Sequence, residues 1–306
     1  MAEFELIDRF FKGLGAKRTD VVLGVGDDGA LISAGNDVDI VTAAASASTV
    51  STHSFSDRPA AFGHRVLATA QNRLAALGAS PAWATLSVTL PQADEAWLQE
   101  FCHGMDSLAK QTNTAIIGGD TTSGPFGVTA VVNGVGKHLD SKVKRDPEAG
   151  DAVLISGVLG GSALAMLATA NPAAMDNEQR NKALTDYAFP MPRCALAEVI
   201  SKYALIAADL SVGLESAMAG LLVNLDVGLS IDISALPVRD QTLSLLAACG
   251  LGTQPLITGS DHELLFFTAT EHVESAVRES NSVGVPVTCV GHLSSESGFK
   301  FRSAAP

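Results

Sequence analysis

Apolar residues alternate with glycine-rich and polar stretches along the first half of the chain, in a pattern that predicts both strands and helices. Runs rich in β-branched residues and bounded by Gly, Asp or Pro are typical of buried strands, and they lie at 21–25, 38–44, 83–90, 114–117 and 128–135. Apolar residues at helical spacing predict helices over 3–12, 59–77 and 94–111, with Asp94 as an N-cap. The first half is therefore expected to be mixed α and β.

A polar, charged segment at 137–151 interrupts this pattern. We therefore predict two domains, 1–137 and 138–306, in keeping with roughly 100–200 residues per domain. In the second half we expect strands at 152–156, 229–233, 262–268 and 286–291, and helices at 163–170, 192–203, 213–225, 239–248 and 271–280. Both halves are thus predicted to be α+β.

The composition narrows the class of protein and of partner. Hydrophobic residues make up 47% of the chain and charged residues 17%, which disfavours disordered, collagen-like and coiled-coil classes. A formal net charge of −13 disfavours broad contact with nucleic acid or an anionic membrane, so a small molecule is the expected partner. Since no run of about 18 apolar residues occurs and residues 1–10 carry charges inside their apolar pattern, we expect a cytoplasmic protein.

Two segments place glycines and carboxylates directly after apolar runs. In the first, at 24–30, the adjacent Asp27 and Asp28 are hard oxygen ligands of the kind that magnesium takes, although an Asp-Gly turn is the alternative. The second segment, at 117–125, is suited to a metal-bound phosphate or to a hairpin turn. Its glycine, carboxylate and hydroxyl residues are Gly118, Gly119, Asp120, Thr121 and Thr122.

Three further segments stand at expected helix starts or turns. The segment 156–163 contains Gly160, Gly161 and Ser162 between a strand and a helix. Exposed amides at such a helix start bind anions, although no P-loop Gly-Lys-Ser/Thr follows. Taken alone, the segments 209–214 and 259–264 favour capped helix starts or turns over a functional site.

In their order along the chain, these five segments resemble the thiamine-monophosphate kinase family, which belongs to the superfamily of aminoimidazole-ribonucleotide synthetase. Further matching segments lie at 63–65, 74–83, 150–151, 190–193 and 285–291, so that the resemblance covers nearly the whole chain. It implies an α+β, two-domain, aminoimidazole-ribonucleotide synthetase-like fold. The N-terminal sheet domain would dimerise, and the C-terminal domain would also be α+β.

The resemblance implies ATP-dependent phosphoryl transfer to thiamine monophosphate or a related phosphate ester, with Mg²⁺, in a homodimer closed by the N-terminal sheets. At the matching positions it assigns Asp27, Asp28 and Asp120 to the metal, and we assign Asp209 and Arg73 to catalysis. Nucleotide and phosphate contacts are expected at a larger set of residues: Gly118, Gly119, Thr121, Thr122, Lys144, Arg145, Gly160, Gly161 and Ser162.

The chain departs from the family pattern where the family carries further carboxylates. The segment 42–49 holds only Ala, Ser and Thr, and both Arg73 and Val212 stand where the family has Asp. Since metals usually neutralise the charge on a transferred phosphoryl group, these changes predict weak magnesium binding or fewer ions. If Arg73 lies close to Asp27 or Asp120, its guanidinium would act as a fixed cation there.

Two functions therefore remain open. One is a working kinase on thiamine monophosphate or a related ester, with fewer metal ions. The other is a non-catalytic or repurposed family member that keeps a nucleotide or metabolite pocket.

Overall fold

The computed structural model describes residues 6–25, 30–35, 38–48, 58–136, 145–223 and 225–302. It divides into two compact units. Unit 1 comprises Met1–Leu74, Ala79–Asp140 and Ala188–Pro190, and unit 2 comprises Ala75–Gly78, Ser141–Tyr187 and Met191–Pro306. The domain boundary expected between residues 137 and 138 lies outside the described residues and stays a prediction. In the described part, no helix is long and apolar enough to cross a membrane.

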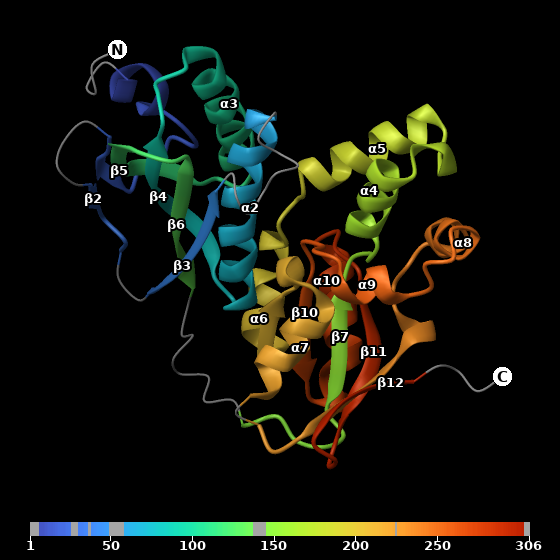
Figure 1. Cartoon of the computed structure of the whole chain (residues 1–306). Coiled ribbons are helices and arrows are strands. Elements are labelled where there is room, and N and C mark those ends of the chain that lie inside the picture. The colour runs from blue at the N-terminus through green and yellow to red at the C-terminus, as the bar shows by residue number, and fades with distance from the viewer. Residues whose placement is uncertain are drawn as a thin grey trace. The chain divides into compact units, whose positions relative to one another are not determined.

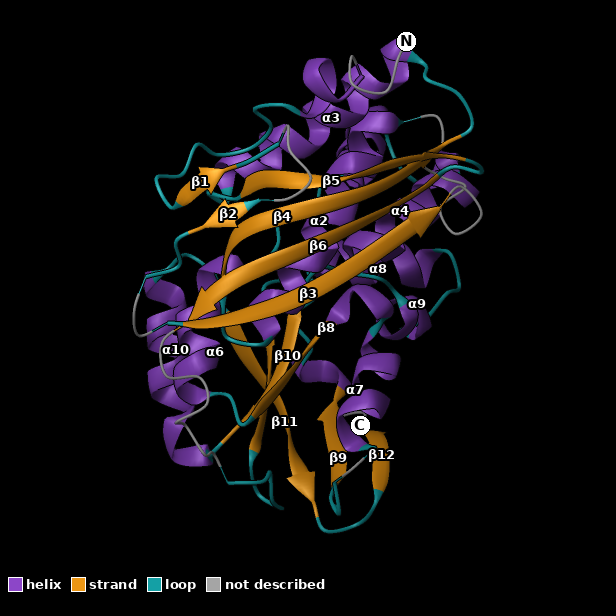
Figure 2. Ribbon diagram, turned by 90° about the vertical axis from the view of Figure 1, so that its left-hand side faces the viewer, coloured by secondary structure: helices purple, strands orange, loops and turns teal. Residues whose placement is uncertain are grey.

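Unit 1 is built on a four-stranded sheet, seen in Figure 2, with the order β3 (Asp39–Ser48), β6 (Gly127–Gly136), β4 (Ser80–Leu90) and β5 (Ala115–Ser123). The strand β6 pairs antiparallel with both of its neighbours, whereas β5 pairs parallel with β4. The remaining elements are a π-helix (Ile7–Phe11), a two-stranded sheet of β1 (Val21–Leu23) and β2 (Leu31–Ile32), and the helices α2 (Pro59–Ala76) and α3 (Glu95–Gln111).

One face of this sheet packs on helices and the other does not. Along β6, the side chains of Val128, Ala130 and Val132 are buried, while those between them are half-buried. This alternation is typical of a sheet with one covered face. Figures 1 and 2 show α2 and α3 on the covered side. The predicted N-cap of α3 is confirmed, because the Asp94 carboxylate accepts a 3.1 Å hydrogen bond from the Trp97 amide.

Unit 2 is built on a six-stranded sheet that is antiparallel except for one edge pair. Its order is β12 (Gly298–Arg302), β9 (Gly228–Asp232), β11 (Val287–Ser294), β7 (Ala152–Ser156), β10 (Leu264–Thr268) and β8 (Ile206–Asp209), with β12 parallel to β9. The α-helices of this part are α4 (Gly161–Ala170), α5 (Asn177–Ala188), α6 (Ala197–Tyr203), α7 (Leu214–Leu222), α8 (Asp240–Ala248), α9 (Gln254–Thr258) and α10 (Val273–Ser282).

Short 3-10 helices lie at Pro172–Ala174, Cys194–Leu196, Leu210–Val212, Ile233–Ala235 and Thr270–His272. Every residue of β7 and of β10 is buried. Their side chains enter two separate hydrophobic clusters, one with α7 and the other with α6 and α10. The two central strands are therefore covered on both faces, which explains their uninterrupted apolar sequence.

The α+β class is confirmed, but several elements differ from the sequence-based expectation. The strands β2, β8 and β12 and the helices α5 and α9 were not expected. The glycines at 118 and 119 do not end their strand, because β5 continues to Ser123 along β4. The hairpin alternative for 117–125 is therefore wrong, because β4 separates β5 from β6 in the sheet.

Candidate functional site

The predicted phosphate segment in β5 lies beside β4 at one edge of the unit 1 sheet. Asp120 is exposed and stands opposite Ser87, and the hydroxyl groups of Thr122 and Thr89 form a 3.0 Å hydrogen bond. Gly119 allows the two strands to approach, because a Cβ there would overlap the backbone of Leu86. The phosphate-binding roles of Gly118, Gly119, Thr121 and Thr122 stay predictions.

Polar groups also gather where α2 meets β3, at the opposite edge of the same sheet. Arg73 donates a 2.7 Å hydrogen bond from Nη1 to the Ala44 carbonyl of the edge strand. Arg73 also lines a hollow of about 130 Å³. The described lining residues are Ala45, Ser46, Ala47, Phe62, Arg65, Val66, Thr69 and Arg73.

The structure separates Arg73 from Asp120. Arg73 reaches the backbone of β3, and Asp120 belongs to β5, with β6 and β4 between these edge strands. Three strand spacings of about 4.8 Å place the edges about 14 Å apart. The possibility that Arg73 stands beside Asp120 is therefore wrong. The other proposed neighbours, Asp27 and Asp28, lie outside the described residues.

In unit 2, the strongest polar cluster surrounds the buried carboxylate of Glu263. Arg193 binds both of its oxygens, through a 2.6 Å contact from Nε to Oε2 and through a second contact from Nη2 to Oε1. The Ser156 hydroxyl donates to Oε2 at 2.6 Å and accepts from the Leu264 amide at 2.8 Å. The Val158 amide donates to Oε1 at 3.3 Å. Burial raises the pKa of Glu263, and the hydrogen bonds and charge of Arg193 act in the opposite direction.

The predicted anion site at the start of α4 has a partner from within the chain. The Asp261 carboxylate accepts hydrogen bonds from the amides of Gly160, at 2.7 Å, and Ser162, at 2.8 Å. Asp261, about a hundred positions further along the chain, thus caps the start of α4. A bound phosphate was expected at this helix start. Ligand binding by Gly160, Gly161 and Ser162 stays a prediction, and it would have to accommodate this carboxylate.

Asp209 ends β8 and is buried. Its carboxylate accepts a 3.1 Å hydrogen bond from the Ser211 amide and another from the Ser211 hydroxyl. The side chain is thereby held in one orientation at the turn that leads into α7. Val212, at the position where the resemblance places an aspartate in the family, is 51% exposed. The catalytic role of Asp209 stays a prediction.

Arg145 and Lys144 are the remaining predicted phosphate contacts, and Lys144 lies outside the described residues. Both terminal nitrogens of Arg145 pair with the buried carboxylate of Asp151, at 2.8 and 2.5 Å. Burial acts to raise the pKa of Asp151, but hydrogen bonds from Arg145 and from the Glu148 amide outweigh it and leave the pKa below its ordinary value. Arg145 thus has a structural partner, and its contact with phosphate stays a prediction.

A multi-ion magnesium site does not fit the residues that the structure describes. Among them, no group of three His, Cys, Asp or Glu side chains lies close enough to hold one ion. Within unit 2, Asp209 contacts Ser211, whereas Asp261 contacts the amides of Gly160 and Ser162. Asp27 and Asp28 lie outside the described residues, and magnesium coordination by them and by Asp120 stays a prediction.

Sequence reasoning missed the roles of Glu263, Arg193, Ser156 and Asp261. A signal was present, because the segments 190–193 and 259–264 were both recognised as motifs. The sequence pattern did not show which of these residues contact one another. Arg193 and Glu263 are 70 positions apart, and Ser156 and Glu263 are 107 apart, so only the folded sheet brings them together.

Comparisons with known proteins place these features in a family context. The family model described as AIR synthase related protein, N-terminal domain, matches residues 26–137. The chain is 33% identical to the thiamine-monophosphate kinase of Escherichia coli K12 over 299 residues, which is 96% of this chain and 91% of the relative. It is also similar to the crystal structure of thiamine-monophosphate kinase from Stenotrophomonas maltophilia, with 30% identity and a TM-score of 0.85 over 100% of this chain and 98% of that one.

A structure of AaThiL complexed with AMPPCP and TMP has the same fold, with a TM-score of 0.71 and 21% identity. That match covers 88% of this chain and 85% of the AaThiL chain.

Proposed function

The chain belongs to the thiamine-monophosphate kinase family, and we propose that it transfers a phosphoryl group from ATP to thiamine monophosphate or a related phosphate ester. The observation that carries this proposal is the 33% identity to the Escherichia coli kinase across 96% of the chain. The complex of AaThiL with AMPPCP and TMP supports a nucleotide and a phosphate ester as the two ligands.

In the proposed reaction, an oxygen of the ester phosphate attacks the γ-phosphorus of ATP. The bond between that phosphorus and the oxygen bridging to the β-phosphate breaks, and its electron pair leaves with ADP. Catalysis of such a transfer depends on positioning and on neutralising the charge of the phosphoryl oxygens. We assign neutralisation to the guanidinium of Arg73 and positioning to Asp209, whose orientation Ser211 fixes.

The buried cluster around Glu263 stabilises a turn in unit 2. By binding Ser156, Val158 and Arg193, this carboxylate holds the turn that follows β7. Magnesium, when bound, would neutralise phosphate charge. We propose that it binds weakly or in reduced number, with Asp27, Asp28 and Asp120 as ligands.

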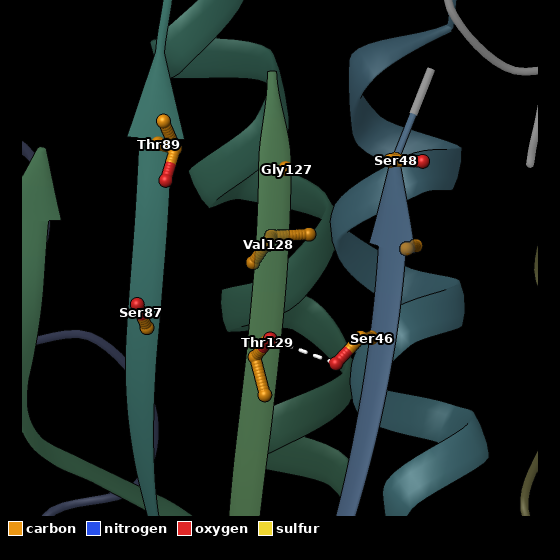
Figure 3. Close-up of a pocket in the computed structure, with 8 residues that line it drawn as sticks. Ser46, Ser48, Ser87, Thr89, Gly127, Val128 and Thr129 are labelled. Carbon is orange, nitrogen blue, oxygen red and sulfur yellow. Dashed lines mark hydrogen bonds between the residues drawn. The ribbon is translucent and has the colours of Figure 1, made fainter. Parts of the chain in front are cut away.

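We propose that the protein acts as a homodimer through the face of the unit 1 sheet that lies opposite α2 and α3. Small hydroxyl side chains line a hollow of about 330 Å³ on this face, and Ser46 and Thr129 are joined across β3 and β6 by a 2.8 Å hydrogen bond (Figure 3). A flat, open face of this kind suits a second copy of the same sheet. Light scattering at micromolar concentration should give the mass of a dimer, and Thr129→Arg should shift it toward a monomer. We propose a cytoplasmic location for this dimer.

A second candidate function, a binding protein without turnover, is favoured by one observation. Val212, on the turn at the start of α7, presents an exposed apolar side chain where the resemblance places an aspartate in the family. Such a protein would retain ligand binding while lacking part of the charge neutralisation that transfer needs.

The deciding experiment is turnover of ATP with thiamine monophosphate over a range of magnesium concentrations, beside the Escherichia coli enzyme. The kinase proposal predicts ADP and thiamine diphosphate in equal amounts. ATP and thiamine monophosphate that bind without forming thiamine diphosphate would instead support the binding protein.

A further inference from the structure

A hydroxyl and a carboxylate are buried together in unit 2, where β7 ends and β10 begins. Ser156, the last residue of β7, is 0% exposed, and Glu263, just before β10, is 3% exposed. The Ser156 hydroxyl donates to Oε2 of Glu263 at 2.6 Å and accepts from the Leu264 amide at 2.8 Å. One side chain of β7 thus binds two consecutive residues at the start of β10.

The same two residues hold the backbone of Asp209 from the other side. Leu264 is the register partner of Asp209, where β10 pairs with β8. The Glu263 carbonyl accepts a 2.9 Å hydrogen bond from the Leu210 amide, which directly follows Asp209. A continuous set of hydrogen bonds therefore runs from the Ser156 hydroxyl, through the start of β10, to the turn that carries the Asp209 carboxylate.

The segment that makes this connection has little freedom to shift. Arg193 binds both carboxylate oxygens of Glu263, and the Val158 amide donates to one of them at 3.3 Å. Two positions earlier, the Asp261 carboxylate binds two amides at the start of α4. Because close-packed and fully bonded segments transmit strain to their neighbours, a change at Ser156 should be felt at Asp209.

We propose that Ser156 and Glu263 are positioning residues for the phosphoryl transfer, which act through the start of β10 to fix the place of the Asp209 carboxylate. This role is additional to their contribution to stability. The inference rests on the proposed function, in which Asp209 helps to position the reacting groups. A displacement of about 1 Å in such a group lowers a rate by up to about a hundredfold, so the connection has a measurable effect.

The test compares two deletions of a buried hydroxyl in the same sheet. Ser156→Ala removes the hydroxyl next to Glu263, whereas the control, Thr268→Val, removes one at the other end of β10. There the Thr268 hydroxyl donates to the Tyr203 carbonyl at 2.9 Å. Thr268 is also 0% exposed, so the two variants lose comparable hydrogen bonds. Four strand residues, about 13 Å, separate Thr268 from Leu264.

With ATP and thiamine monophosphate as substrates, Ser156→Ala should lower kcat about tenfold or more and change either KM by less than about threefold. This split is expected because a misplaced positioning group impairs the transition state more than substrate binding. Thr268→Val should leave kcat within about twofold of the unaltered protein. Circular dichroism in the assay buffer establishes that the whole protein is folded in both variants.

Hydrogen exchange measured by mass spectrometry gives a second readout that needs no turnover. Ser156→Ala should speed the exchange of backbone amides in the segment 209–214 about tenfold or more, because the bond between Leu210 and Glu263 opens more often. Thr268→Val should leave exchange in that segment unchanged. The strand β9, in the same sheet, is the internal reference and should exchange alike in all three proteins.

The inference is overturned if Ser156→Ala leaves exchange in 209–214 unchanged, or if it lowers kcat no more than Thr268→Val does. Turnover by the unaltered protein with unchanged exchange in Ser156→Ala would keep the proposed kinase and remove the positioning role. If the unaltered protein forms no thiamine diphosphate while Ser156→Ala still speeds exchange in 209–214, the proposed kinase fails and the connection from Ser156 to Asp209 stands.

Discussion

The chain carries two arginine-centred clusters that differ in what surrounds the charge. In unit 2, Arg193 meets the carboxylate of Glu263, which is 3% exposed and also takes hydrogen bonds from Ser156 and Val158. In unit 1, Arg65 and Arg73 line a hollow whose other described lining residues are small, hydroxyl or apolar. The counter-charge of Arg193 is buried inside the fold, whereas the described contact of Arg73 is with a backbone carbonyl at the border of the hollow.

This difference separates a buried ion pair from half-buried arginines at the border of a hollow. A buried carboxylate without its partner is costly, so the Glu263 cluster should be needed chiefly for stability. Half-buried arginines at the edge of a hollow contribute little to stability and more to the attraction of an anion. The following substitutions test that contrast, beginning with the largest expected loss.

Replacing Glu263 by alanine should cost about 3–5 kcal/mol of unfolding free energy, because Arg193 and the Ser156 hydroxyl lose a buried partner. Urea unfolding followed by circular dichroism measures the loss. The matched control is Asp186→Ala, which breaks the exposed pair between Lys182 and Asp186 on α5 and should cost less than about 1 kcal/mol. Equal losses in the two variants would remove the distinction between the clusters.

A methyl group at Gly157 should disturb the same cluster from the backbone side. Gly157 has a φ of +58°, and a Cβ there would overlap the carboxylate of Glu263. Gly157→Ala should therefore cost about 2–3 kcal/mol, through strain and displacement of the buried pair. Gly250→Ala is the control, since Gly250 has a φ of +69° with nothing within 4 Å of its Cβ, and it should cost about 1 kcal/mol. If Gly157→Ala and Gly250→Ala lower the unfolding free energy equally, the Glu263 carboxylate moves aside freely.

The fold was largely predictable because the hydrophobic pattern is strong in most elements. Long apolar runs located β4, β6, β7 and β10 close to their observed bounds. The helix α5 escaped notice because its sequence, Asn-Glu-Gln-Arg-Asn-Lys-Ala-Leu-Thr-Asp-Tyr-Ala, is polar on most of its surface. β8 has only four residues, too few to show a period.

The site was less predictable because its contacts join distant parts of the chain. The glycines of β5 suited a hairpin turn because the local sequence does not show that β4 pairs with them. The amides at the start of α4 were expected to bind phosphate because Asp261, their partner, is 99 to 101 positions away. The resemblance identified the family, whereas the pairing of charged residues could be found only from the fold.

A smaller effect is expected from pH, at a buried histidine of α2. His64 is buried, and its Nε2 donates to the Pro190 carbonyl at 2.8 Å. Burial lowers the pKa of His64 below its ordinary 6.5, so the unfolded chain binds a proton more readily than the folded one. The stability that His64 contributes is therefore complete above pH 6.5 and is lost as the pH falls through the lowered pKa.

We expect His64→Gln to reduce the acid-induced loss of unfolding free energy between about pH 7 and pH 5 by about 1 kcal/mol. Urea midpoints across that range measure it. His103→Gln, at an exposed position of α3, is the control and should leave the pH dependence as it is. If the unfolding free energies of His64→Gln and of the unaltered protein change in parallel with pH, the expectation is wrong.

The smallest expected loss is that of Arg73→Gln, and it bears most directly on the contrast. Arg73 is half-buried, and its bond to the Ala44 carbonyl is exposed, so glutamine should lower the unfolding free energy by less than about 1 kcal/mol. Urea unfolding in the absence of ligand measures this, with Arg193→Gln as the comparison from unit 2. If Arg73→Gln destabilises the protein as much as Arg193→Gln does, its charge serves the fold. If it leaves stability nearly unchanged, the fold does not depend on the charge of Arg73.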